Sequence, residues 1–452
     1  MRVRLIAGSL LILILVLQGR AQAPSEAEQQ YLFYVLPLIE RGELANAEER
    51  LLSGVQQYPR SAILYNALGI VYHKQSKMDK AADAFRKALG ILPSFTAAQL
   101  QLASIDQQQG NRTEAAQLFR SAADSTTNFE ALATAGLGLA DCEDYAGAAG
   151  VLERAHALRP RAESVTYNLA LAQYKSGTPA SALESLQSIA AAERQADVLH
   201  LRGKVLEGLG KAEGPDDLTA ACRLEPDKEV FCADAALAAI QQERFQDAIA
   251  VLEPGLEKSP GSLSLLPLMG LSQFRLGRYR DAISSYTAAL EKDSSVDASR
   301  EGLGFLCYVT GDLEKARVVI EEGLKNPKAD FYLAHLEAMV LYRLSPQLRS
   351  KALDAVNRAL QANGKFPPSY FLRGKIRMDR SDFTGALEDF EHAVELDSSY
   401  PLPYYKMAQI YTRQGRRREA EDARRKFSEL GNLREEEILL RQTQNVLLPG
   451  PR

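Results

Sequence analysis

Tryptophan is absent from this 452-residue sequence, and histidine and cysteine are scarce, with five and four residues respectively. The histidines stand singly, so no group of them has the spacing of a zinc site or of a nucleophile with its base. Glycines such as Gly203, Gly208 and Gly210 do not form a phosphate-binding loop, because no strand precedes them and each fits a helix crossing or cap. We therefore expect a protein that is not an enzyme and that uses no metal and no cofactor. The histidines are His73, His156, His200, His335 and His392.

Runs of β-branched residues are also scarce, whereas alanine, leucine, glutamate, arginine and glutamine are abundant. This composition favours helices and gives strands little to form from, so it predicts an all-α fold. The formal net charge is −4. A mildly acidic chain is a poor candidate for general nucleic-acid binding, and we expect no nucleic-acid partner.

Long apolar runs are missing except at the N-terminus. There Arg2 and Arg4 precede an apolar run from Leu5 to Leu17, and small residues follow at Ala21 and Ala23. This pattern is typical of a secretory signal peptide and predicts one over residues 1–23, cut after Ala21 or Ala23. The run is shorter than the roughly 20 residues that a membrane span needs. We therefore expect an exported protein, periplasmic or secreted, without a stable membrane span after cleavage; an uncleaved N-terminal anchor is the alternative.

The rest of the chain repeats itself with a period close to 34 residues. In residues 62–95, Gly69 is followed by Ala81, Phe85 and Pro93, at offsets of 12, 16 and 24. The same three offsets lead from Gly136 to Ala148, Leu152 and Pro160, and from Ala236 to Ala248, Leu252 and Pro260. A period that recurs in several columns at once indicates a solenoid, which we place at residues 24–434. Its twelve units are predicted at 28–61, 62–95, 96–128, 129–162, 163–195, 196–228, 229–262, 263–296, 297–330, 331–366, 367–400 and 401–434.

Each column of the repeat has a physical reason. The small residue and the alanine twelve positions later let two helices approach closely, because bulk there would force the axes apart. A glycine seven positions after the small residue ends the first helix in the left-handed conformation. The proline stops the second helix before the next unit. The glycines at the seventh position are Gly42, Gly110, Gly177, Gly210, Gly277, Gly311 and Gly415.

Segments such as 65–72 (Tyr-Asn-Ala-Leu-Gly-Ile-Val-Tyr) and 167–170 (Tyr-Asn-Leu-Ala) resemble the tetratricopeptide repeat. The resemblance implies a right-handed α-solenoid of tandem helix-turn-helix repeats, in which the first helix of every unit lines a concave groove. Two units depart from the pattern: 196–228 places Pro215 where the alanine belongs, and 331–366 has about two extra residues near Ser345. Ser25 and Glu28 are predicted to form a capping box at the first helix. Residues 435–452 are predicted to form a polar capping helix and a loose tail.

Cys222 and Cys232 could form a disulfide between the end of one helix and the start of the next in an oxidising compartment. They could equally be two small buried residues at helix crossings. Cys142 and Cys307 are too far along the array to pair with them. The sequence leaves this choice open.

In the C-terminal half, positions on one face of the first helices are apolar and aromatic. We predict that this face is a groove for an extended or helical peptide held by apolar anchors. The alternative is that part of the stripe is core between adjacent first helices. The predicted groove residues are Leu271, Phe274, Phe305, Tyr308, His335, Met339, Tyr342, Phe371, Met378 and Tyr405.

The functional hypothesis is a non-catalytic, extracytoplasmic scaffold for protein–protein interaction, with a protein or peptide partner, in the assembly or regulation of envelope or secreted machinery. The alternative is a component of a carbohydrate-processing or polysaccharide-export system that binds or guides a polymer. A basic cluster from Arg413 to Lys426, interleaved with Glu419, Glu421 and Asp422, predicts a solvated helix face with ion pairs. An acidic partner or a membrane surface is the alternative for that cluster.

Overall fold

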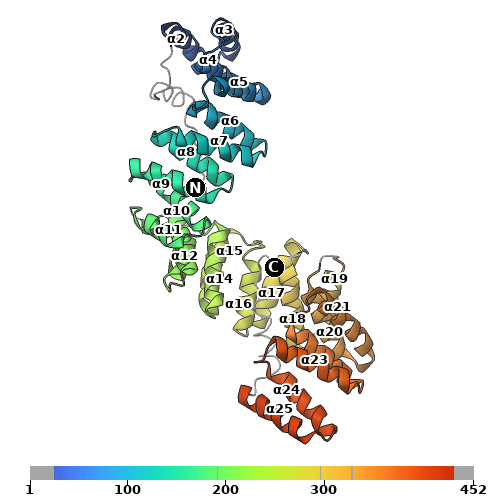
Figure 1. The fold of residues 1–452 in the computed structure, drawn as a ribbon. Coiled ribbons are helices and arrows are strands. Elements are labelled where there is room, and N and C mark those ends of the chain that lie inside the picture. Colours follow the sequence, from blue (N-terminus) through green and yellow to red (C-terminus); the bar gives the residue numbers. More distant parts are fainter. Residues whose placement is uncertain (1–24, 191, 296, 327–328, 432–452) are drawn as a thin grey trace. The chain divides into compact units, whose positions relative to one another are not determined.

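A computed structural model describes residues 25–431 except 191, 296 and 327–328, and over these residues the chain consists of 24 α-helices, two short 3-10 turns and no strand (Figure 1). The chain divides into two compact units, an N-terminal unit (Met1–Asp217) and a C-terminal unit (Leu218–Arg452). The predicted all-α fold of tandem helix-turn-helix repeats is confirmed. The predicted signal peptide (1–23) and the predicted C-terminal segment (435–452) lie outside the described residues.

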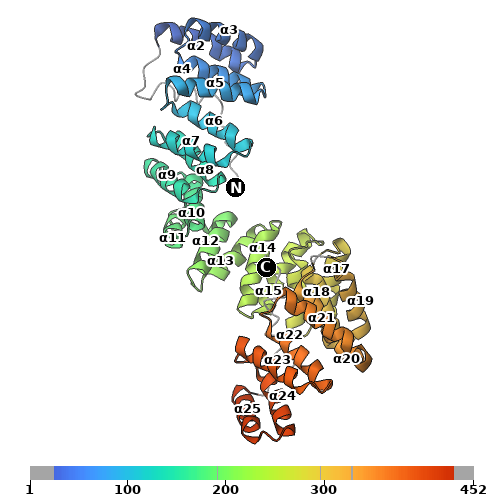
Figure 2. The ribbon, with the colours of Figure 1, turned by 45° about the vertical axis from the view of Figure 1, so that its right-hand side comes forward.

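The N-terminal unit is a series of helical hairpins in which each helix packs on its neighbours in the chain (Figure 2). Its helices are α2 (Glu26–Glu40), α3 (Leu44–Gln57), α4 (Ala62–Lys74), α5 (Met78–Ile91), α6 (Thr96–Gln108), α7 (Arg112–Asp124), α8 (Phe129–Asp141), α9 (Tyr145–Leu158), α10 (Glu163–Lys175), α11 (Pro179–Gln187) and α12 (Ala196–Gly208). A 3-10 turn, η2 (Ala192–Arg194), precedes α12, and α13 (Gly214–Leu224) runs across the boundary between the units.

The C-terminal unit continues the same arrangement. Its helices are α14 (Glu229–Gln241), α15 (Phe245–Lys258), α16 (Leu266–Arg275), α17 (Tyr279–Lys292), α18 (Asp297–Thr310), α19 (Leu313–Gly323), α20 (Phe331–Leu344), α21 (Arg349–Ala362), α22 (Pro367–Asp379), α23 (Phe383–Leu396), α24 (Pro401–Arg413) and α25 (Arg417–Leu430), with η3 (Pro346–Leu348) before α21. Each of the twelve ranges predicted from the sequence holds one pair of these helices, apart from α2, which begins two residues before the first range.

The helices of one pair approach closely at the small residue. A Cβ atom added to Gly69 would lie 2.6 Å from the Phe85 ring, and one added to Gly374 would lie 2.5 Å from the Phe390 ring. Real Cβ atoms do not approach other heavy atoms this closely, so only glycine fits without a shift. The side chain sixteen positions later therefore lies directly over the glycine, and the alanines at the twelfth position, such as Ala81 and Ala386, are fully buried beside it.

The turn after the first helix has a left-handed residue in eleven of the twelve pairs of the described chain. All seven glycines that were predicted to end a first helix have positive φ angles, between 67° and 88°. The same position holds Ser76, Glu143, Glu243 and Ser381 in four other pairs, with φ between 57° and 66°. The turn geometry is thus kept where glycine is absent, at a cost of about 1 kcal/mol for each residue with a Cβ.

In the two irregular units, the departures from the repeat pattern change the structure only locally. In the α20–α21 pair the extra residues form η3, so that Ala352, two positions later than the pattern requires, is the buried alanine. Pro215 lies in the first turn of α13, where the missing N–H leaves no helical hydrogen bond unmade. The predicted capping box is also present, since Ser25 and Glu28 exchange hydrogen bonds at the start of α2.

Cys222 and Cys232 form a disulfide that joins α13 to α14. Of the two possibilities that the sequence left open, the structure therefore has the disulfide and not two separate buried thiols. Cys142 and Cys307 are free.

Two glycines of the N-terminal unit test the left-handed turn. Gly110 has a φ of 88° and Gly90 lies within α5, and an added Cβ would meet no atom within 4 Å at either site. We expect Gly110→Ala to destabilise the protein by about 1–2 kcal/mol, because an L-residue is strained at positive φ. The matched Gly90→Ala variant should be stabilising by about 0.5–1 kcal/mol, because alanine loses less entropy in a helix. Chemical denaturation of both variants measures the difference, and equal effects would contradict the role given to the turn.

Candidate functional site

Six of the ten predicted groove residues are buried. Leu271, Phe274, Phe305, His335, Met339 and Phe371 are each less than 7% exposed. The Phe274 and Phe305 rings meet edge to face with centroids 5.6 Å apart, which joins α16 to α18. These side chains pack between successive first helices. They form a buried layer beneath the surface, which a partner cannot reach in this conformation. For these six residues, the alternative that the sequence left open therefore holds: they are core between adjacent first helices.

His335 shows how closed this layer is. Its ring stacks on Tyr332 and meets the Phe366 ring edge to face, with centroids 5.9 Å and 5.1 Å away. Its Nδ1 is hydrogen-bonded to the Ser369 hydroxyl at 2.9 Å, and its Nε2 has no hydrogen-bond partner among the described residues. Complete burial lowers the pKa of His335 to about 3, so the imidazole is neutral at ordinary pH.

The other four predicted residues are accessible. Tyr308, Tyr342 and Met378 are half-buried, and Tyr405 is 44% exposed. They come from α18, α20, α22 and α24, the first helices of four successive pairs. Whether they contact a partner stays a prediction. Their exposure makes these four the part of the predicted groove that a ligand can touch.

Each accessible tyrosine lies against a cation. The Arg343 guanidinium lies 5.1 Å from the centroid of the Tyr308 ring, and the Lys375 ammonium lies 5.1 Å from that of Tyr342. The Lys406 ammonium lies 5.6 Å from the centroid of Tyr405. We call this surface the tyrosine–cation strip and define it as Tyr308, Tyr342, Met378, Tyr405, Arg343, Arg349, Lys375 and Lys406. Rings and cations at these distances attract each other, which holds both in place on the surface.

Tyr342 is the best-anchored residue of the strip. Its hydroxyl donates a hydrogen bond of 2.9 Å to the Asp379 carboxylate, which also pairs with Arg349 at 3.0 Å. The Arg349 guanidinium in turn lies 5.2 Å from the centroid of the Tyr342 ring. The ring is therefore fixed from α21 and α22 at once, and little side-chain entropy remains to be lost when a ligand binds.

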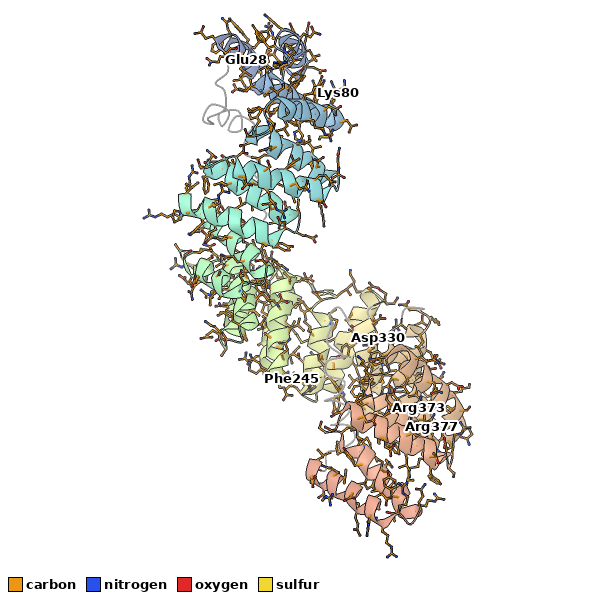
Figure 3. All side chains as sticks on the ribbon, viewed as in Figure 1. Glu28, Lys80, Phe245, Asp330, Arg373 and Arg377 are labelled. Carbon is orange, nitrogen blue, oxygen red and sulfur yellow. A yellow bond between two sulfur atoms is a disulfide. The ribbon has the colours of Figure 1, made fainter. Side chains whose placement is uncertain are left out.

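An ion-pair cluster around a buried carboxylate joins α22 to α23. Asp389 is 1% exposed and accepts hydrogen bonds from Arg373, while Arg377 pairs with the same carboxylate at 3.0 Å. Arg373 and Arg377 lie one turn apart on α22 (Figure 3). Burial raises the pKa of Asp389, and the two guanidinium groups oppose this shift. Lys375 is the cation of α22 that lies in the strip, because its ammonium lies over the Tyr342 ring.

Sequence reasoning missed these cations, since it followed only the apolar positions. A signal was present: Arg343, Lys375 and Lys406 each lie next to, or three residues from, a stripe position on the same helix. The predicted helix face at Arg413–Lys426 is exposed and carries the expected ion pairs, among them Arg416 with Glu419 and Arg425 with Asp422.

Other surfaces offer less. An open hollow of about 210 Å³ between α7 and α9 is lined by Arg120 and Arg154, but these pair with Asp144 and with backbone oxygens of Ala123 and Thr126. Across the residues that the structure describes, no group of three or more histidine, cysteine or acidic side chains could hold a metal ion. Nor does any helix there have the length and apolar character needed to cross a bilayer.

Family models match three segments of the chain. A model described as "Tetratricopeptide repeat" matches residues 38–94 and 268–330, and one described as "TPR repeat" matches residues 374–415. No curated protein matches the sequence. The matched segments lie in both units, and the last includes the end of α22 from Gly374 onward, all of α23 and all of α24.

Solved structures with similar folds include the Cut9–Hcn1 hetero-tetramer of the APC/C, at 13% identity and a TM-score of 0.45, covering 96% of this chain and 99% of that chain. Yeast Tom70 matches at 12% identity and a TM-score of 0.39, covering 92% and 98%. YrrB, described as a TPR protein with an unusual peptide-binding site, matches at 18% identity and a TM-score of 0.37, covering 40% and 95%. At these values the likenesses give no correspondence between individual residues.

The buried His335 predicts a pH-dependent stability. Its pKa is about 3 in the folded protein and about 6.5 in an unfolded chain, so between these values only the unfolded state binds the proton. The free energy of unfolding should therefore fall as pH falls below about 6.5, by at most about 1.4 kcal/mol per pH unit from this residue. His335→Asn, which keeps a neutral partner for Ser369, should have a shallower slope than the unsubstituted protein in urea unfolding between about pH 6 and pH 4. Identical slopes would show that the histidine is not buried in solution.

Proposed function

Because the chain is a tetratricopeptide-repeat protein, we propose that it is a non-catalytic scaffold that acts outside the cytoplasm and holds a protein partner on the tyrosine–cation strip. The repeats themselves are those of protein–protein interaction scaffolds. The proposal adds the location and the surface. It assigns the protein to the assembly or regulation of envelope or secreted machinery.

The single observation that carries the surface is the row of accessible side chains on four successive first helices, of which three are tyrosines and the one on α22 is Met378. Tyrosine provides a large contact area at a small entropic cost and is enriched among the residues that dominate binding energy. Tyr308 and Tyr342 are already held by cations and hydrogen bonds before a ligand arrives. Beneath them, buried residues such as Phe305 and Met339 make the surface rigid. A rigid surface with exposed aromatic side chains is what a peptide-binding site requires.

Two independent features support a location outside the cytoplasm. The first is the sequence of residues 1–23, which has the charge, apolar run and small residues of a signal peptide. The second is the disulfide between Cys222 and Cys232, since such bonds persist in oxidising compartments and are rare in the cytosol. Neither feature depends on the other.

The strip gives the first test. We expect the triple substitution Tyr308→Ala, Tyr342→Ala and Tyr405→Ala to abolish capture of the partner from an extract of the source cells, because each anchor contributes on the order of 2 kcal/mol. Affinity capture of the full chain, followed by mass spectrometry, measures the loss. Tyr34→Ala is the matched control, since Tyr34 is 58% exposed but belongs to the N-terminal unit. Unchanged capture by the triple variant would place the binding surface elsewhere, and capture of a polysaccharide alone would favour the carbohydrate-binding alternative.

The location gives the second test. Protein purified from the source cells should begin at Gln22 or Pro24, which N-terminal sequencing reads directly. Under denaturing conditions without reductant, a thiol reagent should label Cys142 and Cys307 but not Cys222 or Cys232. An intact Met1 together with four reactive thiols would contradict export.

A further inference from the structure

We infer that the exported chain forms a symmetric dimer, in which the outer side of α2 packs against the same side of α2 from a second copy, with the two helices antiparallel. This surface is separate from the tyrosine–cation strip. The inference rests on the proposed function in one respect only, the removal of the signal peptide. It is carried by the register of the repeat, by the exposed side chains of α2 and by the placement of their charges.

The repeat shows which side of a first helix packs against the preceding hairpin. The positions two before and two after the small residue lie on that side. Gly302 of α18 and Gly138 of α8 occupy them, and a Cβ added to either would clash with the ring of Tyr286 or Phe119 on the preceding second helix. Where these positions hold other residues, the side chains are apolar and buried, as in Ala67, Val71, Leu372 and Ile376.

In α2 the same two positions are exposed. Gly42 and Ala47 place the small position of this hairpin at Val35. The corresponding residues are therefore Phe33 and Pro37, and Phe33, at 74%, is the most exposed of the large hydrophobic side chains that the structure describes. Terminal units of repeat arrays require a polar outer face, because this face meets water. An aromatic side chain there instead indicates a surface that packs against another protein.

The N-terminal residues of the exported chain are too few to cover this surface. After cleavage at either proposed position, no more than three residues precede Ser25, the N-cap of α2. The inner sides of α2 pack against α3 and α4 (Figure 1). What covers the outer side must therefore be another chain or a distant part of the same chain.

The exposed residues of α2 include a continuous stripe in which neighbours are three or four residues apart, so that they share one face of the helix. We call it the α2 outer stripe. Its centre is aromatic, and its two ends carry opposite charges. The stripe consists of Glu26, Gln30, Phe33, Tyr34, Pro37 and Arg41.

Two copies of this stripe are complementary when they are antiparallel. With the two-fold axis between Phe33 and Tyr34, each of these rings faces the other ring of the second copy, which is a favourable aromatic contact. Glu26 then faces Arg41 of the second copy at both ends. The Arg41 guanidinium uses its Nε for Glu43 and for the backbone oxygen of Pro37, which leaves its two terminal nitrogens for a further carboxylate. A parallel arrangement would bring Glu26 against Glu26.

The first test measures the mass of the exported chain in solution. A contact one helix wide is small, so analytical ultracentrifugation should show a monomer–dimer equilibrium over roughly 1–100 μM. Phe33→Glu should weaken the dimer at least about tenfold, because it places a carboxylate in an apolar contact. Val318→Glu is the matched control, since Val318 of α19 is an exposed hydrophobic residue outside the stripe, and it should change nothing. A monomer at every concentration would overturn the inference.

The second test exchanges charges to examine the antiparallel register. Glu26→Arg alone and Arg41→Glu alone each place like charges at both ends of the pair, so each variant should dimerise at least about tenfold more weakly than the unsubstituted chain. An equal mixture of the two variants should form a mixed dimer, because each end again joins a carboxylate to a guanidinium. If the mixture stays monomeric while circular dichroism shows both variants folded, the inference is wrong.

The third test identifies what covers the stripe. Benzoylphenylalanine in place of Tyr34 keeps an aromatic side chain, and irradiation of the purified chain mixed with an isotope-labelled copy should link it to α2 of the other copy. A link to residues 432–452, or to another protein when an extract of the source cells is irradiated, would overturn the inference.

The outcomes separate this inference from the proposed function. A correctly cleaved chain that remains monomeric contradicts the dimer alone, whereas a dimer whose triple tyrosine variant still captures the partner contradicts the strip alone. Because the strip belongs to the C-terminal unit, the substitutions in α2 leave its residues unchanged.

Discussion

The fold depends on one close contact, repeated along the chain, in which a large side chain of the second helix lies directly over a residue without bulk on the first. Phe85 over Gly69, Leu152 over Gly136 and Tyr286 over Gly270 are the same contact made with different side chains. Where the first helix has a glycine there, the second helix can approach until van der Waals contact is complete. That approach fixes the angle of each hairpin, and thereby sets which residues of the first helix face the next hairpin and which face solvent.

The strip follows from that division. Positions such as Phe305 and Met339 are turned into the layer between first helices, whereas Tyr308 and Tyr342, three residues further along the same helices, reach the edge of that layer. The buried residues make the surface stiff, and the half-buried rings give it contact area. Cations from the first helix of the next pair, Arg343 and Lys375, and Arg349 at the start of α21 then lie over these rings. The apolar stripe looks uniform in the sequence, but in the structure it consists of a buried layer between first helices and a set of accessible residues on the surface.

The sequence predicted the repeat well because its signal is redundant: Ala81, Ala148 and Ala386 each mark a crossing that neighbouring columns also mark. It predicted the left-handed glycines, since φ at a helix end is a local property. It did not predict Ser76, Glu143, Glu243 and Ser381 in the same conformation, because their side chains give no local sign of it. The sequence also did not predict the burial of His335, because that depends on how the next hairpin, with Phe366 and Ser369, packs against α20. The choice between thiols and a disulfide at Cys222 likewise required the distance between two helix ends.

Within each unit, a hairpin packs chiefly on the hairpins before and after it, so the contacts that stabilise the unit are short in sequence. Chains with this property fold quickly, because little loop entropy is lost before contacts form. Every completed hairpin presents a finished surface on which the next can close. The array can therefore lengthen by whole hairpins over evolutionary time, since a duplicated unit arrives with the surfaces that it needs on both sides.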